Sequence, residues 1–171
     1  TLILDGKKAR SVYAVRLKDK ISKLPLKPVL AIIQIGDRDE SNAYIKSKIK
    51  FMEEVGVEVL HIKLSESIGE GEAIERIESL NKDKSINGII VQLPIPDPVV
   101  DFGITQSAEY DAKMHYRARI QKIIDSIIPI KDVDGLTTII SVARAKGDRK
   151  AMMPATARGV MELLEFYKIS V

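Results

Sequence analysis

Short apolar segments alternate with helix-like segments along the first part of the chain. The apolar segments are residues 29–35, 57–64 and 87–93, and the last of them is rich in β-branched side chains. Between them, residues 41–55 and 71–81 carry apolar side chains at three- and four-residue steps, the spacing of an amphipathic helix. Strands joined by single helices lie parallel, and such connections place helices on both sides of the sheet. The sequence therefore predicts an α/β fold: an open, mostly parallel βαβ sheet with helices on both faces.

The segments outside this alternation are predicted to be largely helical. Residues 5–24 place apolar side chains on one stripe of a helix that ends at Pro25. Ser41 or Asn42 is expected to cap the next helix and Gly56 to end it. Beyond residue 98, residues 99–109 show no period, whereas 111–128, 136–145 and 156–167 favour helices. We divide the chain into an α/β domain (1–98), an atypical insertion with a helix (99–130), and an acidic turn with helices (131–171).

The composition excludes several classes of site. The 171 residues include no cysteine and only two histidines, His61 and His115, so we expect neither disulfides nor a protein-held metal. Aromatic residues make up 5%, which leaves few stacking surfaces for single-stranded nucleic acid, and no nucleic-acid partner is expected. The net charge of +3 suits an anionic small molecule. The chain has no apolar run of membrane-spanning length and no signal-peptide pattern, which predicts no membrane partner and a cytoplasmic location.

Lys48 stands where the second helix is expected to carry an apolar residue. On a helical wheel it lies near the middle of an arc of apolar side chains that includes Tyr44, Ile45 and Phe51. One interpretation is that its alkyl stem packs while the ammonium reaches water at the sheet edge. The other is that it lines a cleft, where an amine held out of water exchanges protons near neutral pH. Tyr44, one turn earlier on the same face, would then form a wall for a flat ligand.

Two polar features follow predicted strands or helices. Gln92, at the carboxyl end of the third strand, lies where open α/β sheets bind ligands. It is either a strand-end polar residue facing water or an amide that orients the Lys48 amine without adding a charge. Residues 131–135 read Lys-Asp-Val-Asp-Gly, a tight acidic turn. It is either an Asx-type turn with Gly135 at the strained position, or a pair of carboxylates, Asp132 and Asp134, that grips a ligand with several N–H donors.

Seven short motifs, taken in order, resemble those of the bifunctional methylenetetrahydrofolate dehydrogenase/methenyltetrahydrofolate cyclohydrolase family. Each motif is short, and it is their shared order along the chain that carries the resemblance. The motifs are Leu4-Asp5-Gly6-Lys7, Ile35-Gly36-Asp37 followed by Ser41, Tyr44-Ile45-Lys46-Ser47-Lys48, Gly56-Val57, Asn87-Gly88-Ile89-Ile90-Val91-Gln92-Leu93-Pro94, Lys131-Asp132-Val133-Asp134-Gly135-Leu136, and Pro154-Ala155-Thr156 with Gly159-Val160-Met161-Glu162-Leu163-Leu164.

The resemblance implies an enzyme of one-carbon folate metabolism. Members of the family oxidise 5,10-methylenetetrahydrofolate with NADP or NAD and hydrolyse 5,10-methenyltetrahydrofolate to 10-formyltetrahydrofolate. Lys48 matches their catalytic lysine, and Gln92 matches its amide partner. Tyr44 matches the aromatic residue at the catalytic site that stacks on the folate. The resemblance also leaves room for a homodimer.

The same resemblance assigns binding roles to further residues. Asp134 matches the residue that holds the pterin. Leu93 and Pro94, with Tyr44, are implied to contact the substrate, a tetrahydrofolate derivative. Thr156 is implied to contact the edge of the nicotinamide cofactor. By this resemblance residues 1–98 form the folate-binding catalytic domain, and residues 131–171 lead toward a nucleotide-binding domain.

Some features depart from the family pattern. The family continues into a Rossmann domain, whereas this chain stops at Val171, and Gly69-Glu70-Gly71 lacks the third glycine and the ribose-binding acid of a dinucleotide motif. We therefore expect the chain to carry the folate site without the main domain for NADP or NAD, so that hydride transfer fails. The stretch from Gln92 to Asp134 is longer than in the family, and Pro154-Ala155-Thr156-Ala157 replaces its Pro-Cys-Thr-Pro motif.

Three interpretations of function stay open at this point. The chain is a piece of an enzyme that has both activities, or it is a whole protein that retains only cyclohydrolase chemistry or folate binding. The third interpretation is a non-catalytic α/β binding or interaction module in which Lys48 reaches water and the acidic turn is structural. A shielded Lys48 beside Gln92 distinguishes the first two interpretations from the third.

Overall fold

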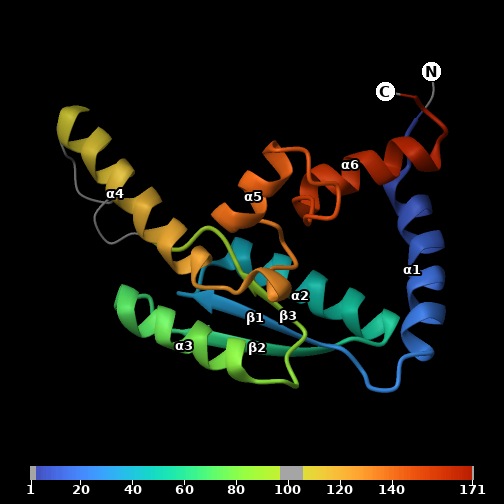
Figure 1. Cartoon of the computed structure of the whole chain (residues 1–171), viewed down its shortest axis with the longest axis horizontal. Helices are drawn as coiled ribbons and strands as arrows, with labels where there is room; N and C mark the ends of the chain where they lie inside the picture. Colours follow the sequence, from blue (N-terminus) through green and yellow to red (C-terminus); the bar gives the residue numbers. More distant parts are fainter. Residues whose placement is uncertain (1–2, 97–105, 171) are drawn as a thin grey trace.

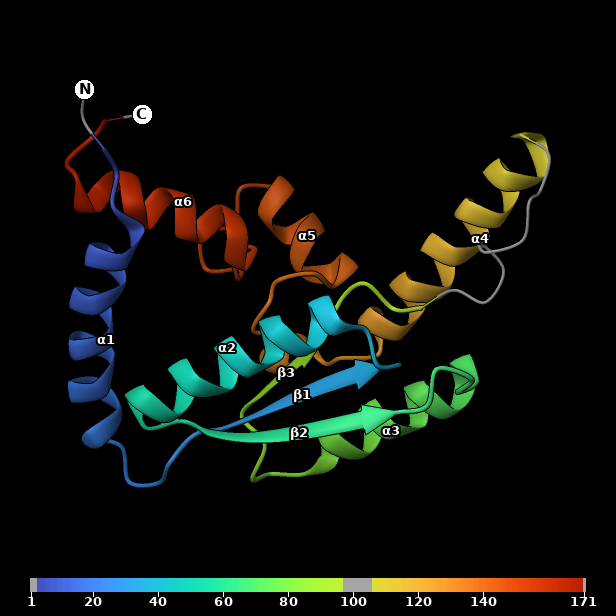
Figure 2. The same ribbon diagram turned by 180° about the vertical axis from the view of Figure 1, so that it is seen from behind.

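A three-stranded parallel sheet forms the centre of the protein. The computed structural model describes residues 3–96 and 106–170. The strands β1 (Val29–Ile35), β2 (Glu58–Leu64) and β3 (Gly88–Val91) lie in the order β2-β1-β3. The helices α2 (Asp39–Val55) and α3 (Glu70–Lys82) connect consecutive strands and lie on opposite faces of the sheet (Figures 1 and 2). The predicted open parallel βαβ sheet with helices on both faces is thereby confirmed.

The central strand supplies side chains to two separate apolar layers. Ala31 and Ile33 belong to the larger layer, which α3 and α4 (Gln106–Asp125) cover. Leu30 and Ile32 belong to the smaller layer, which α2 covers. Because successive side chains of a strand point to opposite faces, the apolar residues of β1 fill both layers.

The start of α2 differs from the expected one. Its first residue is Asp39 and its N-cap is Arg38, whereas Ser41 or Asn42 was expected to cap it. Ser41 is buried in the helix, and the side chain of Asn42 is hydrogen-bonded to the sheet, so neither is placed to cap. The acidic Asp39 in the first turn favours this start because the helix N-terminus carries a partial positive charge. Gly56 ends the helix as predicted, in the left-handed conformation with φ of 94°.

The helix α1 (Gly6–Ser22) buries less of its predicted apolar stripe than expected. Ala9 is buried, whereas Leu17 is 39% exposed. The helix lies at the periphery, beside the end of α2 and beside α6 (Ala155–Phe166), where no sheet face is available to cover it (Figure 1). The backbone N–H of Asp5 donates to the hydroxyl of Tyr167 at 2.9 Å, which ties the start of α1 to the end of α6.

The helices α5 (Thr138–Ala145) and α6 lie close to the expected 136–145 and 156–167. The 3₁₀ turn η1 (Pro129–Lys131) was not among the expected helices. The helix α4 begins and ends earlier than the expected 111–128, and β3 ends at Val91, before Gln92. The boundary expected at residues 98 and 99 lies outside the described residues. Within the described ranges, no helix combines the length and the apolar character needed to cross a membrane.

Lys131 is a buried cation at the end of α3. Its ammonium donates to the carbonyls of Leu80, Asn81 and Asp83 at 2.8, 2.8 and 2.6 Å. A helix leaves its last carbonyls without helical partners, and a positive charge is favourable there. Lys131 thus fixes η1 to α3, and it thereby holds the acidic turn that follows against β3.

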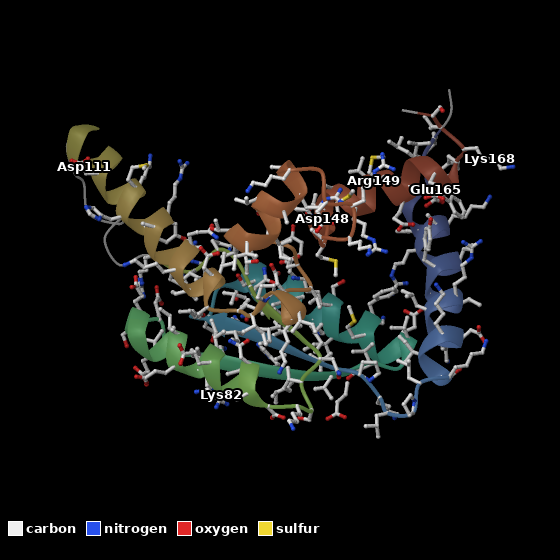
Figure 3. The ribbon with its side chains drawn as sticks, in the orientation of Figure 1. Lys82, Asp111, Asp148, Arg149, Glu165 and Lys168 are labelled. Atoms are coloured by element: carbon white, nitrogen blue, oxygen red, sulfur yellow. The ribbon has the colours of Figure 1, made fainter. Side chains whose placement is uncertain are left out.

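We predict that Lys131→Met lowers the free energy of unfolding by about 2–4 kcal/mol, because one buried and two part-buried carbonyls lose their donor. Urea titration followed by circular dichroism measures this loss. Lys82→Met is the matched control, since Lys82 is exposed at the end of the same helix (Figure 3). Equal losses in the two variants would contradict the structural role of Lys131.

Candidate active site

A cavity of about 390 Å³ lies between α2, the start of the sheet and the acidic turn. Most of its wall is apolar, and Lys48 and Asp134 are its charged residues. The lining consists of Pro28, Val29, Leu30, Lys48, Met52, Val57, Asn87, Gly88, Ile90, Val133, Asp134 and Ala155. The cavity therefore runs beneath α2 toward the first residues of β1 and β3. The sequence predicted a ligand site beyond the carboxyl ends of the strands, whereas this cavity extends to the first residues of two strands.

Gly88 and Val133 shape this cavity. A side chain at Gly88 would clash with Val133, because its Cβ would lie 2.7 Å from Val133 Cγ1. Because Gly88 has no side chain, the turn residue Val133 can pack onto β3. Neither residue was among the predicted site residues. In the sequence, Val133 is an apolar residue between two aspartates, and Gly88 is a glycine at the start of a strand. Sequence reasoning assigns both features to packing.

Lys48 and Gln92 form a direct hydrogen bond. Lys48 Nζ donates to Gln92 Oε1 at 3.0 Å, which joins the middle of α2 to the residue that follows β3. Gln92 is 8% exposed, and its Nε2 donates to the carbonyl of Leu93 at 2.6 Å. Because that second bond occupies the amide nitrogen, the amide oxygen is the atom presented to the amine. Lys48 is half-buried in the cavity wall and does not extend freely into water.

The two aspartates of the acidic turn have different environments. Asp132 is 2% exposed, and its carboxylate accepts from the backbone N–H groups of Gly135, Leu136 and Thr137 at 2.8, 3.4 and 2.9 Å. It is therefore the structural residue of an Asx-type turn. Asp134 lines the cavity instead. Asp132 therefore fits the interpretation of a structural turn, and Asp134 fits the interpretation of a carboxylate that faces a ligand.

The environment of Asp134 disfavours its charged form. Burial raises the pKa of Asp134 above its ordinary value. The positive charge of Lys48 acts in the opposite direction on this pKa, and the negative charge of Asp132 raises it further. Lys48 is therefore the cation that offsets part of the cost of placing a carboxylate in this wall.

Gly135 brings the segment before α6 to the site. Its φ is +70°, a conformation that favours glycine, and a Cβ would lie 3.0 Å from the carbonyl oxygen of Met152 and 3.1 Å from the nitrogen of Pro154. The turn and the backbone of this segment are therefore in close contact. This contact places Ala155, the first residue of α6, in the cavity wall.

The remaining predicted site residues, like Gln92, lie outside the cavity lining. Tyr44 is 67% exposed on the first part of α2, one turn before Lys48. Leu93 is partly buried against the larger apolar layer, and Pro94 is exposed after a cis Leu93-Pro94 peptide bond. Thr156 is exposed in the first turn of α6. The structure therefore brings Lys48 together with Gln92 and with Asp134, and it shows no hydrogen bond between Lys48 and the other four residues in the part of the chain that it describes.

Gly69 and Gly71 lack the close packing of a dinucleotide-binding turn. Glycines of a dinucleotide-binding turn permit close approach of backbone to phosphate and close packing of helix on strand. At Gly69 and Gly71 a Cβ would meet no heavy atom within 4 Å, so neither glycine is required by close packing. A dinucleotide-binding role is accordingly not assigned to Gly69 and Gly71.

Comparison with known proteins connects this geometry to a family. Residues 4–111 match the family model described as the catalytic domain of tetrahydrofolate dehydrogenase/cyclohydrolase. The bifunctional protein FolD of Campylobacter jejuni is 36% identical over 172 residues, which are 99% of this chain and 54% of that protein. Human cytoplasmic C-1-tetrahydrofolate synthase is 36% identical over 169 residues, which are 95% of this chain and 16% of that protein.

Solved structures agree with these relatives. The crystal structure of Campylobacter jejuni FolD, a methylenetetrahydrofolate dehydrogenase/cyclohydrolase, matches 98% of this chain and 54% of its own with a TM-score of 0.82 and 36% identity. A 5,10-methylenetetrahydrofolate dehydrogenase from the silkworm Bombyx mori matches with a TM-score of 0.81 and 33% identity, over 98% of this chain and 52% of its own. The chain thus spans about half the length of these enzymes. It belongs to the tetrahydrofolate dehydrogenase/cyclohydrolase family and contains the family's catalytic domain.

Proposed function

We propose that this chain binds the folate substrate of a methylenetetrahydrofolate dehydrogenase/methenyltetrahydrofolate cyclohydrolase and supplies its catalytic lysine. The observation that carries the proposal is the hydrogen bond from Lys48 Nζ to Gln92 Oε1 beside an apolar cavity that also contains Asp134. A cavity with one amine, one carboxylate and apolar walls suits a flat ligand that has N–H donors and a reactive carbon. The interaction-module interpretation offers no reason for this combination.

Asp134 is the proposed anchor of the pterin ring. A carboxylate with two free oxygens accepts from ring N–H and amino donors, and such charge-assisted bonds are strong when they are partly buried. The apolar wall, including Val133 and Met52, covers the faces of the ring. Tyr44, exposed one turn before Lys48, is proposed to stack on the part of the folate that leaves the cavity. Leu93 and Pro94 then contact the same part of the substrate from the loop after β3.

Lys48 is the proposed acid and base of methenyl hydrolysis. In its neutral form the amine keeps an N–H on Gln92 Oε1 and accepts a proton from water with its lone pair. The hydroxide attacks the cationic methenyl carbon between N5 and N10, which gives a tetrahedral hydroxyl adduct. Lys48 returns the proton to N5, the bond from this carbon to N5 breaks, and the carbonyl of 10-formyltetrahydrofolate forms with release of one proton from the hydroxyl group. Gln92 orients the amine throughout without a charge that would hold the proton on it.

The dehydrogenase step of the proposed enzyme needs NADP or NAD, which accepts the hydride from the methylene carbon. In this chain only Thr156 is proposed to contact the edge of that cofactor, whereas Asp134 and the apolar wall hold the folate. The name of the human relative places that protein in the cytoplasm, and we propose the same compartment and a homodimer for the enzyme that contains this chain.

We predict that Lys48→Met lowers the rate of methenyltetrahydrofolate hydrolysis by about 10²–10⁴-fold, the contribution of a positioned acid–base group. Methionine keeps the length of the stem and the apolar packing, so folate binding changes little. The decay of methenyl absorbance measures the rate, and isothermal titration calorimetry measures binding. An unchanged rate in this variant would remove the lysine mechanism.

We predict that Asp134→Asn weakens binding of the folate by about 10- to 100-fold, because a charge-assisted hydrogen bond contributes roughly 1.5–3 kcal/mol. Asp132→Asn is the matched control two residues away. That variant loses bonds from backbone N–H groups, so it lowers the free energy of unfolding instead. If both variants lost stability and neither lost affinity, Asp134 would be a turn residue only.

Asp134→Asn also changes the pH dependence of stability. Because the pKa of Asp134 is raised in the folded protein, the contribution of this carboxyl to stability is present below its ordinary value of 3.8 and is lost as the pH rises through the folded-state pKa. We therefore expect the variant to be more stable than the wild type at neutral pH. Urea titrations at a series of pH values should show this difference shrinking as the pH falls toward 3.8. A difference that is constant with pH would contradict the assignment.

A further inference from the structure

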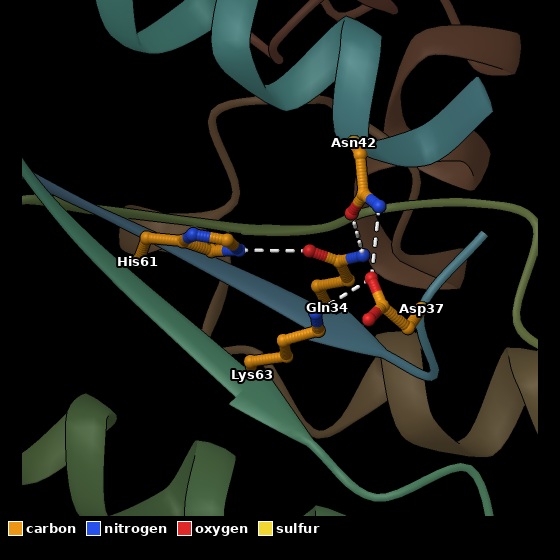
Figure 4. Close-up of polar contacts among 5 residues, drawn as sticks. All are labelled: Gln34, Asp37, Asn42, His61 and Lys63. Atoms are coloured by element: carbon orange, nitrogen blue, oxygen red, sulfur yellow. Dashed lines mark hydrogen bonds and ion pairs between the residues drawn. The ribbon is translucent and has the colours of Figure 1, made fainter. Parts of the chain in front are cut away.

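Gln34 is a buried amide in an otherwise apolar strand. It is 1% exposed, and its neighbours along β1 are Ile33 and Ile35. A buried polar group left without partners costs about 1–3 kcal/mol, so the hydrogen bonds of Gln34 account for its place. Gln34 Nε2 donates to Asn42 Oδ1 at 2.7 Å, and Gln34 Oε1 lies 2.9 Å from His61 Nε2 (Figure 4).

The direction of every bond in this network follows from Asp37. Its carboxylate accepts from Asn42 Nδ2 at 2.8 Å and from Lys63 Nζ at 2.5 Å, and these two bonds lower the pKa of Asp37. The charged carboxylate can only accept, so Asn42 must present its nitrogen to Asp37 and its oxygen to Gln34. Gln34 must then present its oxygen to His61, whose Nε2 is the donor.

This network joins three elements at the first turn of α2. Gln34 belongs to β1, His61 and Lys63 belong to β2, and Asn42 belongs to α2 (Figure 4). Within the described residues Arg38, the N-cap of α2, makes no side-chain capping hydrogen bond. Asn42 therefore provides the side-chain polar anchor of this end of the helix. Hydrogen bonds of fixed direction at this end of the helix restrain its rotation about its axis and its position along the sheet.

Lys48 follows Asn42 by six residues on the same helix, and the 3.0 Å bond from Lys48 Nζ to Gln92 Oε1 requires that helix to be correctly placed. Between them, Ile45 packs into the apolar layer beneath α2. Apolar packing tolerates small shifts of a helix, whereas hydrogen bonds with fixed direction tolerate them poorly. The polar anchor and the catalytic pair are thus connected through about two turns of rigid helix.

We propose that Asn42 and its partner Gln34 are positioning residues for Lys48. They hold α2 in the one setting that places the Lys48 amine on Gln92. The claim that Asn42 and Gln34 position the Lys48 amine can be tested without measuring activity. The claim that this position affects hydrolysis rests on the proposed function. A displacement of about 1 Å at a catalytic group costs up to roughly 10²-fold in rate.

A charge exchange between positions 37 and 42 tests the proposal. In Asn42→Asp, two carboxylates face each other across the former 2.8 Å hydrogen bond. In the double variant Asn42→Asp with Asp37→Asn, the new amide at position 37 donates to one oxygen of the new carboxylate at position 42, and the other oxygen of that carboxylate accepts from Gln34. The net charge equals that of the wild type, and the anchor is rebuilt with one bond reversed. Asn42→Ala removes the anchor without introducing repulsion, should the single charged variant fail to fold.

Acylation by acetic anhydride reports the position of the Lys48 amine without reference to catalysis. Mass spectrometry compares labelling of Lys48 with labelling of Lys50, an exposed lysine of the same helix in the same molecule. We expect Asn42→Asp and Asn42→Ala to raise the relative labelling of Lys48 several-fold and the double variant to restore it. Lys46→Ala is the control for a change on α2 outside the network, and it should leave the ratio of Lys48 to Lys50 labelling unchanged.

Hydrolysis supplies the second measurement. The single variants should lower kcat by about tenfold, the scale of a small displacement of a catalytic group, and the double variant should recover it. Urea titration accompanies each variant. The proposal is overturned if Lys48 labelling stays at the wild-type ratio in Asn42→Ala, or if the double variant recovers stability but not the labelling ratio. If wild type and Lys48→Met hydrolyse the substrate equally, the proposed function fails, and the labelling ratio still decides whether Asn42 positions the amine.

Discussion

The hydrogen bond between Lys48 and Gln92 sets the requirements that the rest of the site meets. An amine among apolar side chains needs an acceptor, and a neutral amide provides one without fixing the proton on the nitrogen. A carboxylate in that position would hold the amine in its charged form. The bond also connects the middle of α2 to the end of β3, so every contact that places α2 on the sheet bears on the chemistry. Ile45 supplies the apolar part of that placement and Asn42 the polar part.

The acidic turn shows how two identical side chains acquire different tasks. The carboxylate of Asp132 is occupied by backbone N–H groups, and this fixes the turn. Asp134 projects into the cavity wall, where burial raises its pKa and the charge of Lys48 partly compensates. Lys131, beside them, secures the turn to the end of α3 through three carbonyls. In the proposed ligand site, Asp134 is the carboxylate available to the ligand, and the neighbouring Asp132 and Lys131 already have their own hydrogen bonds.

The sequence predicted the framework well because the framework depends on local and periodic features. The alternation of apolar runs with helical spacing sufficed for the parallel sheet, and Gly56 ended α2 where a left-handed residue was needed. The errors concern residues whose local preference was overridden by tertiary contacts. Asn42 has the side chain of a good helix cap, but a buried amide in β1 uses it instead. The stripe of α1 has helical spacing, but no sheet face is available to bury all of it.

For the candidate site, the sequence by itself determined the chemistry that is present: a lysine in an apolar arc, an amide at a strand end and two carboxylates in a tight turn. Such features are set by residue type and by spacing along one element. Only the tertiary structure decided which groups meet, that Asp134 and not Asp132 faces the cavity, and that the cavity extends beneath α2 past Gly88. These outcomes depend on distances between elements far apart in the chain. No local pattern specifies such distances, because they result from packing two layers against one sheet.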